Sequence, residues 1–152
     1  MKSTTLVYIE KGGKYLMIHR TKKEKDENKD KWIGIGGKLE EGESPFDGAR
    51  REVLEETGLT VDKLSYRAII TFILDGKTEY MHLFHTDLFS GEVKTDCDEG
   101  DLAWIDKNEL MSLDVWEGDK IFLDMLDKEK RFYSLKLEYD KDGKLLNSVL
   151  EF

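Results

Sequence analysis

Short runs in which hydrophobic and polar residues alternate dominate the chain, and this spacing of two is typical of half-buried β-strands. Near the N-terminus, the runs Thr5–Glu10 and Lys14–Arg20 flank a Gly-Gly pair, which predicts a hairpin. Two longer runs, 60–74 and 77–89, are joined by an Asp-Gly pair, a strong signal for a tight hairpin turn. The pattern therefore predicts two hairpins before any helix is considered.

Two other segments read as helices, the first from its end signals and the second from its helical spacing. In the first, Ser44 is placed to cap a helix, Pro45 suits its first turn and Asp47 completes a capping-box pattern. Gly58 is placed to end the same helix. The second segment, 118–129, gathers its apolar residues on one side. We expect an amphipathic helix at each place.

The remaining segments complete a mixed fold. Residues 32–37 predict a short strand that ends in glycines, residues 102–110 a strand running into a helical turn, and residues 131–152 a last hairpin. Residues 21–31 are almost wholly charged, which is typical of a solvated loop, although the lysines could approach a phosphate. Strands and helices do not alternate regularly, so we expect an α/β fold with a mixed sheet, in one domain of residues 1–152.

Composition narrows the classes of function. A hydrophobic content of 39% supports a buried core, and a net charge of −9 disfavours a general nucleic-acid-binding surface. A phosphorylated substrate is compatible with this charge, because a bound cation inverts the local field. The single cysteine, Cys97, allows no internal disulfide, and no stretch reaches the ~20 apolar residues of a membrane span. The N-terminus lacks the apolar core of a signal peptide, so we expect a cytoplasmic protein.

The first predicted helix carries acidic residues in unusual places. At about 100° per residue, Glu52, Glu55 and Glu56 share one arc, which lies beside the apolar stripe rather than opposite it. Glu55 and Glu56 also fall in the last turn, where the helix dipole disfavours anions. An ordinary acidic surface helix accounts for the spacing alone. With Arg51 and the preceding glycine run, a divalent cation bound by carboxylate oxygens becomes an equal alternative.

The same residues resemble the signature of a known family. Gly37, Glu43 and the run 51–59 reproduce the Nudix signature G-x5-E-x7-R-E-U-x-E-E-x-G-U, with every fixed position filled and an aliphatic residue at both U positions. The resemblance implies an α/β/α sandwich, in which a central mixed β-sheet lies between helices and the signature forms a loop-helix-loop. It also implies a Nudix hydrolase, in which water attacks a phosphorus of a nucleoside diphosphate linked to another group.

The resemblance further implies roles for the residues of the signature. Glu52, Glu55 and Glu56 look like the ligands of Mg²⁺, which Mn²⁺ can replace, and the backbone carbonyl of Gly37 often joins them. Arg51 looks like the residue that orients a catalytic glutamate through a charge-assisted hydrogen bond. The general base varies in this family, and both Glu56 and Glu52 are candidates.

Three further positions receive roles from the resemblance. Glu43 looks like a residue that stabilises the signature loop through a salt bridge, and Gly58 would serve the turn after the helix. Glu99 resembles an additional metal-binding or basic glutamate found outside the signature. A plain surface residue within the acidic run 95–101 is an equally good interpretation of Glu99.

The nucleotide is indicated only by residues outside the signature. Segments around Trp32 and Trp116, together with the C-terminal run, resemble those of the MutT-type 8-oxo-dGTP diphosphatases. The resemblance implies a purine pocket lined by Trp116 and Asp119, since an indole can stack on a base and a carboxyl group can bond its edge. Core packing is the alternative for each aromatic residue, and it is stronger for those inside apolar runs. Further substrate-binding candidates are Phe72, Trp32 and Lys38.

Two departures from the resembling enzymes bear on selectivity. Ile33 stands where they carry an asparagine, and Gly118 stands beside Asp119 where they have an acidic pair. Apolar contacts discriminate poorly between similar ligands, so a broader preference for purine triphosphates is also open.

The expected partner is a nucleotide substrate, with no membrane, no stable nucleic-acid complex and either a monomer or a homodimer. One alternative is a Nudix hydrolase of another diphosphate, such as ADP-ribose or a dinucleoside polyphosphate. Another is a non-catalytic module that binds nucleotides. The complete set of Arg51 and three glutamates disfavours the module, because such domains commonly lose these residues.

Overall fold

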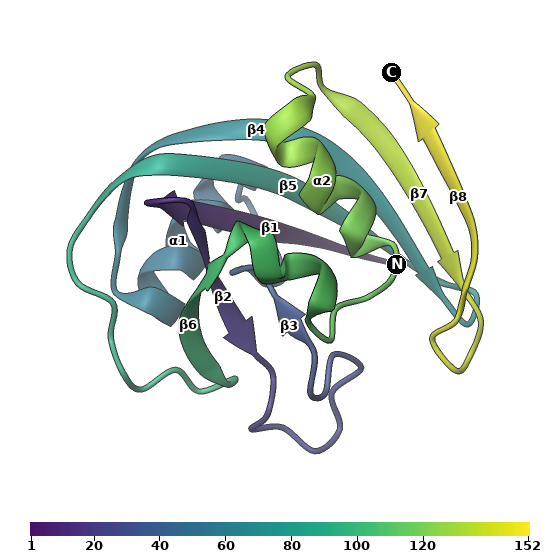
Figure 1. The fold of residues 1–152 in the computed structure, drawn as a ribbon, viewed down its shortest axis with the longest axis horizontal. Coiled ribbons are helices and arrows are strands. Elements are labelled where there is room, and N and C mark those ends of the chain that lie inside the picture. Colours follow the sequence, from purple (N-terminus) through teal and green to yellow (C-terminus); the bar gives the residue numbers. More distant parts are fainter.

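A computed structural model of residues 1–152 shows an eight-stranded mixed sheet (Figure 1). The strand order is β3-β2-β1-β5-β4-β7-β8, and β6 pairs with β2 outside this path. The β1–β5 and β4–β7 pairs are parallel, and every other pair is antiparallel. The strands are β1 Lys2–Lys11, β2 Lys14–His19, β3 Trp32–Ile33, β4 Thr60–Leu74, β5 Lys77–Ser90, β6 Asp101–Asp106, β7 Tyr133–Tyr139 and β8 Leu145–Glu151.

Helix α1 begins and ends where the sequence signals place it. In α1 (Pro45–Thr57), the Ser44 hydroxyl accepts a hydrogen bond from the Asp47 amide, and the Asp47 carboxylate accepts one from the Ser44 amide. Gly58 ends α1 in the left-handed region, at φ 81°, where a residue without Cβ is favoured. The other helices are the short 3₁₀-helix η1 (Lys107–Ser112) and α2 (Asp119–Lys128).

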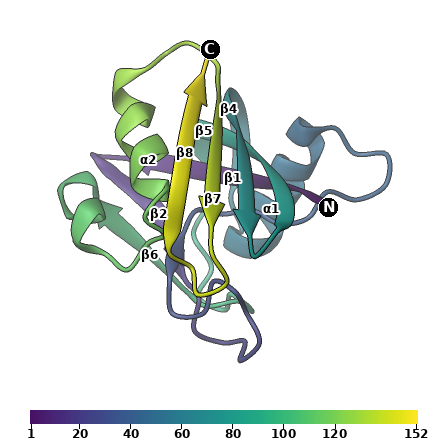
Figure 2. The ribbon, with the colours of Figure 1, turned by 90° about the vertical axis from the view of Figure 1, so that its right-hand side faces the viewer.

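The sheet lies between the two α-helices, as Figure 2 shows. On one face, Ala49 and Val53 of α1 pack without exposed surface in a core of 12 buried residues. On the other face, Phe122 and Leu126 of α2 belong to a core of 19 buried residues. The expected α/β/α sandwich with a central mixed sheet is therefore confirmed.

All three predicted hairpins are present as antiparallel pairs, β1–β2, β4–β5 and β7–β8. The turn between β4 and β5 uses Asp75 and Gly76, both at positive φ, as the Asp-Gly signal predicts. The strand expected over 32–37 differs, because regular pairing stops at Ile33. The remaining residues leave β2 and cross to β1.

This crossing fills a fork in the sheet. β1 and β2 pair only from Ile9 to Leu16 and then diverge. Residues 32–39, the wedge segment, enter the gap: β3 pairs with β2, and Ile35 then exchanges backbone hydrogen bonds of 2.6 and 3.0 Å with Val7 of β1. A Cβ at Gly36 would lie 1.8 Å from the Thr5 carbonyl oxygen, so only glycine fits there. Gly36 is therefore required by close backbone approach.

Two further observations concern the chain as a whole. Cys97 is buried and forms no disulfide. None of the helices is both long enough and apolar enough to span a membrane.

Candidate active site

Two carboxylates of α1 face the wedge segment at the fork. An added Cβ at Gly37 would lie 2.6 Å from a carboxylate oxygen of Glu52, so glycine leaves the room that this side chain occupies. The Gly36 amide donates a hydrogen bond of 3.3 Å to Glu56 Oε2. Glu56 is buried beside the apolar stripe of α1, as the helical arc predicts. The glycines thus bring backbone and carboxylates into direct contact.

Glu56 carries the largest electrostatic perturbation in this group. It is only 8% exposed, and burial, together with the neighbouring Glu99 carboxyl group, raises its pKa to about 10. Burial also raises the pKa of Glu52, to which the charges of Glu55 and Glu99 add. Glu99 therefore lies beside the signature carboxylates in space, although more than forty positions separate it from Glu52 in sequence.

Arg51 organises the signature residues around a single guanidinium group. Its Nε and Nη2 atoms bind the Glu43 carboxylate at 2.7 and 2.9 Å, a two-point ion pair that lowers the pKa of Glu43 to about 2. Its Nη1 atom donates to Glu52 at 2.8 Å and to Glu55 at 3.2 Å. A further bond of 3.1 Å reaches the Lys38 carbonyl. Arg51 thus ties the signature loop to α1 and fixes the Glu52 side chain.

The donor set of this region suits a hard divalent cation, which takes oxygen ligands. Glu52, Glu56 and Glu99 supply carboxylate oxygens, and a cation among them would stabilise the charged carboxylates against the burial and the mutual repulsion that raise the pKa values of Glu52 and Glu56. In this structure, no three acidic, histidine or cysteine side chains are placed so that they could hold a metal ion together. Glu55 is well exposed, with 58% of its side chain accessible, and is held by Arg51.

Gly37 contributes a backbone carbonyl to the same place. This carbonyl accepts a 2.9 Å hydrogen bond from the Thr5 amide, which uses one of its two lone pairs.

A cleft of about 570 Å³ adjoins these carboxylates. Its aromatic wall consists of Phe72 and Trp116, which pack edge to face with ring centroids 5.0 Å apart. Both rings are 5% exposed, so each belongs to the core and to the cleft at once. The candidate residues that line the cleft are Gly37, Lys38, Phe72, Glu99, Trp116 and Asp119. One cavity therefore connects the aromatic wall with the glycines at the fork and with Glu99, whereas the α1 carboxylates Glu52, Glu55 and Glu56 lie behind its lining.

Asp119, the first residue of α2, places a buried carboxyl group in this cleft. It is 4% exposed, and its Oδ1 atom has no hydrogen-bond partner. Burial raises its pKa to about 8, while Lys31 acts in the opposite direction. The raised pKa favours the protonated form, which can both donate and accept a hydrogen bond.

The structure also shows why the acidic pair is reduced to one residue. A Cβ at Gly118 would lie 2.5 Å from the Tyr139 hydroxyl oxygen and 2.7 Å from Leu137. The Gly118 amide donates a 2.7 Å hydrogen bond to the same hydroxyl group. Close packing on β7 thus leaves no room for a second side chain next to Asp119.

Trp32 differs from expectation, because it does not line the cleft. Successive residues of a strand point to opposite sides, and here Ile33 lines the cleft while Trp32 stacks on His19 of β2. The two rings are nearly parallel, with centroids 4.6 Å apart. The burial of the two tryptophans also differs from expectation. Trp32 lies in an apolar run and was expected to be the more buried, but Trp116 is the more buried of the two.

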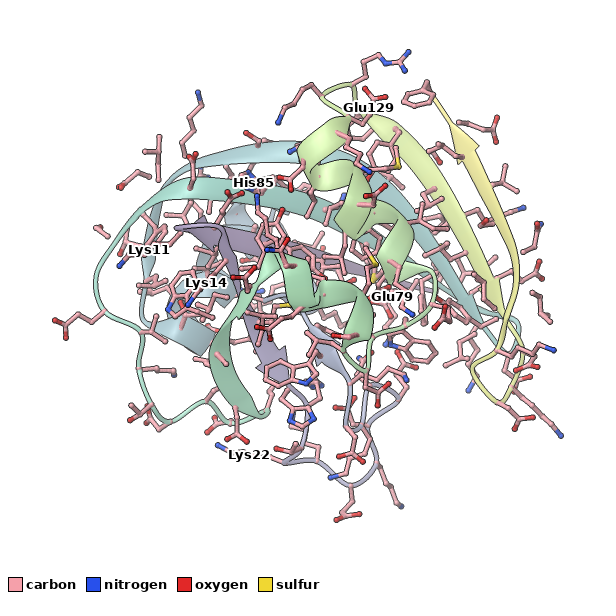
Figure 3. The ribbon with its side chains drawn as sticks, in the orientation of Figure 1. Lys11, Lys14, Lys22, Glu79, His85 and Glu129 are labelled. Carbon is pink, nitrogen blue, oxygen red and sulfur yellow. The ribbon has the colours of Figure 1, made fainter.

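The sequence alone does not predict that the charged loop, residues 21–31, forms part of the site. Residues 25–28 line the cleft, which corrects the expectation of a purely solvated loop. Ion pairs and backbone bonds hold the loop: Lys22, at the lower edge of Figure 3, donates to the Cys97 carbonyl. Glu79 on β5, also labelled in Figure 3, lines the cleft and accepts a 2.7 Å hydrogen bond from Thr4. Only the lysine content of the run had pointed to a ligand.

Residues 2–126 match the family of the NUDIX domain, which covers the fork, α1, the cleft and most of α2. The chain belongs to this family. It is accordingly a Nudix hydrolase, of a family that acts on phosphoanhydride bonds and generally uses divalent metal ions.

Individual relatives of this Nudix hydrolase share more than the signature. It is 36% identical over 133 residues to the oxidized purine nucleoside triphosphate hydrolase of Danio rerio, covering 86% of this chain and 83% of the relative. The enzyme of the same name from Mus musculus is 36% identical over 123 residues, covering 80% and 78%. The crystal structure of a MutT protein from Bacillus halodurans superimposes with a TM-score of 0.88 at 26% identity, covering 99% and 98%.

Proposed function

We propose that this Nudix hydrolase is a Mg²⁺-dependent pyrophosphohydrolase of purine nucleoside triphosphates. Its preferred substrates are oxidised purine dNTPs such as 8-oxo-dGTP, which it converts to the monophosphate and pyrophosphate. One observation carries the proposal: a single cleft runs from the buried carboxyl group of Asp119 to Gly36 and Gly37, the glycines that contact the Glu56 and Glu52 carboxylates of α1. The names of the Danio rerio and Mus musculus relatives support the same substrate class.

At the fork, Glu52, Glu56 and Glu99 would hold the cation, with Glu55 and the Gly37 carbonyl as further ligands. When bound, Mg²⁺ or Mn²⁺ polarises the phosphate and lowers the pKa of the attacking water.

The protein groups around this cation have separate tasks. Arg51 keeps the Glu52 carboxylate in a fixed orientation through the 2.8 Å bond. Either Glu56 or Glu52 accepts the proton of the attacking water. Lys38 and Lys25 line the cleft and would offset the negative charge of the phosphates.

In the base pocket, Phe72 and Trp116 offer flat apolar surfaces against which a purine can pack. Asp119 offers the unpaired carboxyl group to the edge of the base, where it can satisfy its own buried Oδ1 atom. Ile33 contributes an apolar surface where the resembling enzymes have a polar one. The cytoplasmic nucleotide pool is the proposed place of action, with the enzyme as a monomer or a homodimer.

The deciding experiment measures pyrophosphate or phosphate release with Mg²⁺ over a panel of substrates. The panel contains 8-oxo-dGTP, dGTP, dATP, ADP-ribose and a dinucleoside polyphosphate. A kcat/KM for 8-oxo-dGTP well above that for dGTP supports the proposal. Equal rates on all triphosphates would indicate a general nucleotide pyrophosphatase, and turnover of ADP-ribose alone would reject the proposal. Binding without any turnover would indicate a non-catalytic nucleotide-binding module.

A further inference from the structure

We infer that Asn28, in the charged loop, determines base specificity by donating a hydrogen bond from its side-chain amide to an oxo group of a purine. The inference rests on the proposed function only in placing a nucleobase in this cleft. Neither the signature nor the resemblance to the MutT-type enzymes assigns a role to this residue.

The orientation of the Asn28 amide is fixed by its neighbour Trp116. The indole Nε1–H group can only donate, and it lies 2.7 Å from Asn28 Oδ1. The side-chain oxygen of Asn28 therefore points toward Trp116. The side-chain nitrogen Nδ2, which carries two N–H donors, is not used by this bond. Asn28 is half-buried and lines the cleft, and Nδ2 has no hydrogen-bond partner in the protein.

The loop holds Asn28 in place before any ligand binds. The backbone N–H group of Asn28 donates to Asp26 Oδ1 at 3.0 Å, and the backbone carbonyl of Asn28 accepts a hydrogen bond from the Lys31 backbone amide at 2.9 Å. The second oxygen of Asp26 accepts a 2.8 Å hydrogen bond from Arg20 Nε, and the Asp26 side chain is only 7% exposed. A donor on such an anchored turn loses little conformational entropy on binding.

The surroundings make this donor decisive for base choice. Ile33 is apolar, and the Trp116 nitrogen is occupied by Asn28 itself, so neither offers the base a free polar group. Among the residues of the pocket, Asn28 is thus the neutral side chain that supplies unpaired N–H donors at every pH. A 6-oxo or 8-oxo group of a purine accepts such a bond, whereas the exocyclic amino group of adenine would set donor against donor.

The substitution Asn28→Asp tests this with minimal change of shape. One carboxylate oxygen can still accept from Trp116, while the two N–H donors become an acceptor. We would titrate dGMP, 8-oxo-dGMP and dAMP into the full-length protein by calorimetry. Asn147→Asp, on the exposed edge strand β8, makes the same chemical and charge change away from the cleft.

In the wild type, both oxopurine monophosphates should bind more tightly than dAMP. Asn28→Asp should weaken their binding about tenfold and leave dAMP unchanged or tighter, whereas Asn147→Asp should behave as wild type. A second variant, Asn28→Ala, should lose oxopurine affinity without any gain for dAMP. It separates the lost donor from the added charge.

The inference is overturned if Asn28→Asp weakens all three nucleotides equally, changes none of them, or if the wild type binds no nucleobase. Circular dichroism and thermal unfolding of each variant show whether the loop change has disturbed the fold. Turnover is measured separately: wild type that binds oxopurines selectively but hydrolyses no triphosphate sinks the proposed function and leaves the role of Asn28 standing.

Discussion

Asp119 and Glu56 are buried carboxyl groups whose pKa values are raised for different reasons. Asp119 is isolated at the start of α2, and burial alone raises its pKa. Glu56 is buried as well, but it also faces the Glu99 carboxyl group. A ligand that supplies a hydrogen-bond partner would suit the first group, and a cation would suit the second.

The pKa of Asp119 makes folding stability depend on pH. Its folded value of about 8 lies above its ordinary value of 3.8, so the native state binds the extra proton between these limits. Stability contributed by this proton is complete below about pH 4 and is lost as the pH rises toward 8. Asp119→Asn removes the dependence, so its Tm should exceed that of the wild type at pH 8 and approach it near pH 4. Metal-free thermal unfolding across this range measures the difference, and an offset that does not vary with pH would contradict the assignment.

Glu56→Gln should separate catalysis from folding. If Glu56 holds the cation or accepts the proton of water, kcat should fall about a thousandfold or more. In metal-free protein the same change should raise the free energy of unfolding at pH 8, because Glu56 binds its proton more tightly when folded, with a pKa of about 10 against 4.5. Glu41→Gln, on an exposed loop position, removes the same charge and should change neither quantity. Near-normal turnover of Glu56→Gln would reject the site assignment.

At the scale of elements, the site depends on how α1 meets the wedge segment. α1 supplies Glu52 and Glu56, and the wedge segment supplies two glycines that permit close contact from opposite directions. Gly36 faces the backbone of β1, whereas Gly37 faces the Glu52 side chain.

Alanine at these two glycines should have different effects. A Cβ at Gly36 would lie 1.8 Å from the Thr5 carbonyl, a backbone atom that cannot move aside, so Gly36→Ala should cost about 3 kcal/mol or more in unfolding free energy. A Cβ at Gly37 meets the end of a flexible carboxylate, so Gly37→Ala should fold and lose activity by displacing Glu52. Urea unfolding and kcat/KM for each variant test the contrast. Equal destabilisation by both changes would refute it.

Local signals in the sequence account for most elements but not for the fork. Ser44, Asp47 and Gly58 define α1 through bonds within the same segment, and these signals can be read without the fold. The pairing of Ile35 with Val7 joins residues from separate elements, and no spacing rule contains it. The same holds for the charged loop, whose place in the cleft is set by distant partners.

At the scale of the whole molecule, a chain of contacts connects the two ends of the cleft. Trp116 bonds Asn28, and Asn28 bonds Asp26. Arg20 bridges Asp26 and Glu99, with bonds of 2.8 and 3.0 Å. Glu99 in turn lies beside the Glu56 carboxyl group of α1, so the base pocket and the acidic cluster share one scaffold.

Removal of the bridge should disturb both ends. Arg20→Gln leaves the Asp26 carboxylate, with 7% of its side chain exposed, without its ion partner, which should cost about 3 kcal/mol. KM should rise with the loosened loop, and kcat should fall as Glu99 loses its partner. Lys23→Gln is the matched control, because Lys23 also faces Glu99, at 3.6 Å, but is 57% exposed. Chemical unfolding and steady-state kinetics decide, and indistinguishable variants would exclude the bridge.

The fork between β1 and β2 also bears on the order in which strand pairs form during folding. The β1–β2 hairpin joins neighbouring residues, whereas β1 must find β5 across about half of the chain, pairing Lys2 with Glu79. Non-local pairings close late, and β1, whose Val7 bonds Ile35 of the wedge segment, lies between that segment and β5. Amide hydrogens at Val7 and Ile35 should therefore exchange with solvent only when this whole region opens. Their exchange rates therefore report on the geometry of the candidate site without substrate or cation. If the fork loosens, these rates should rise before those of the rest of the sheet.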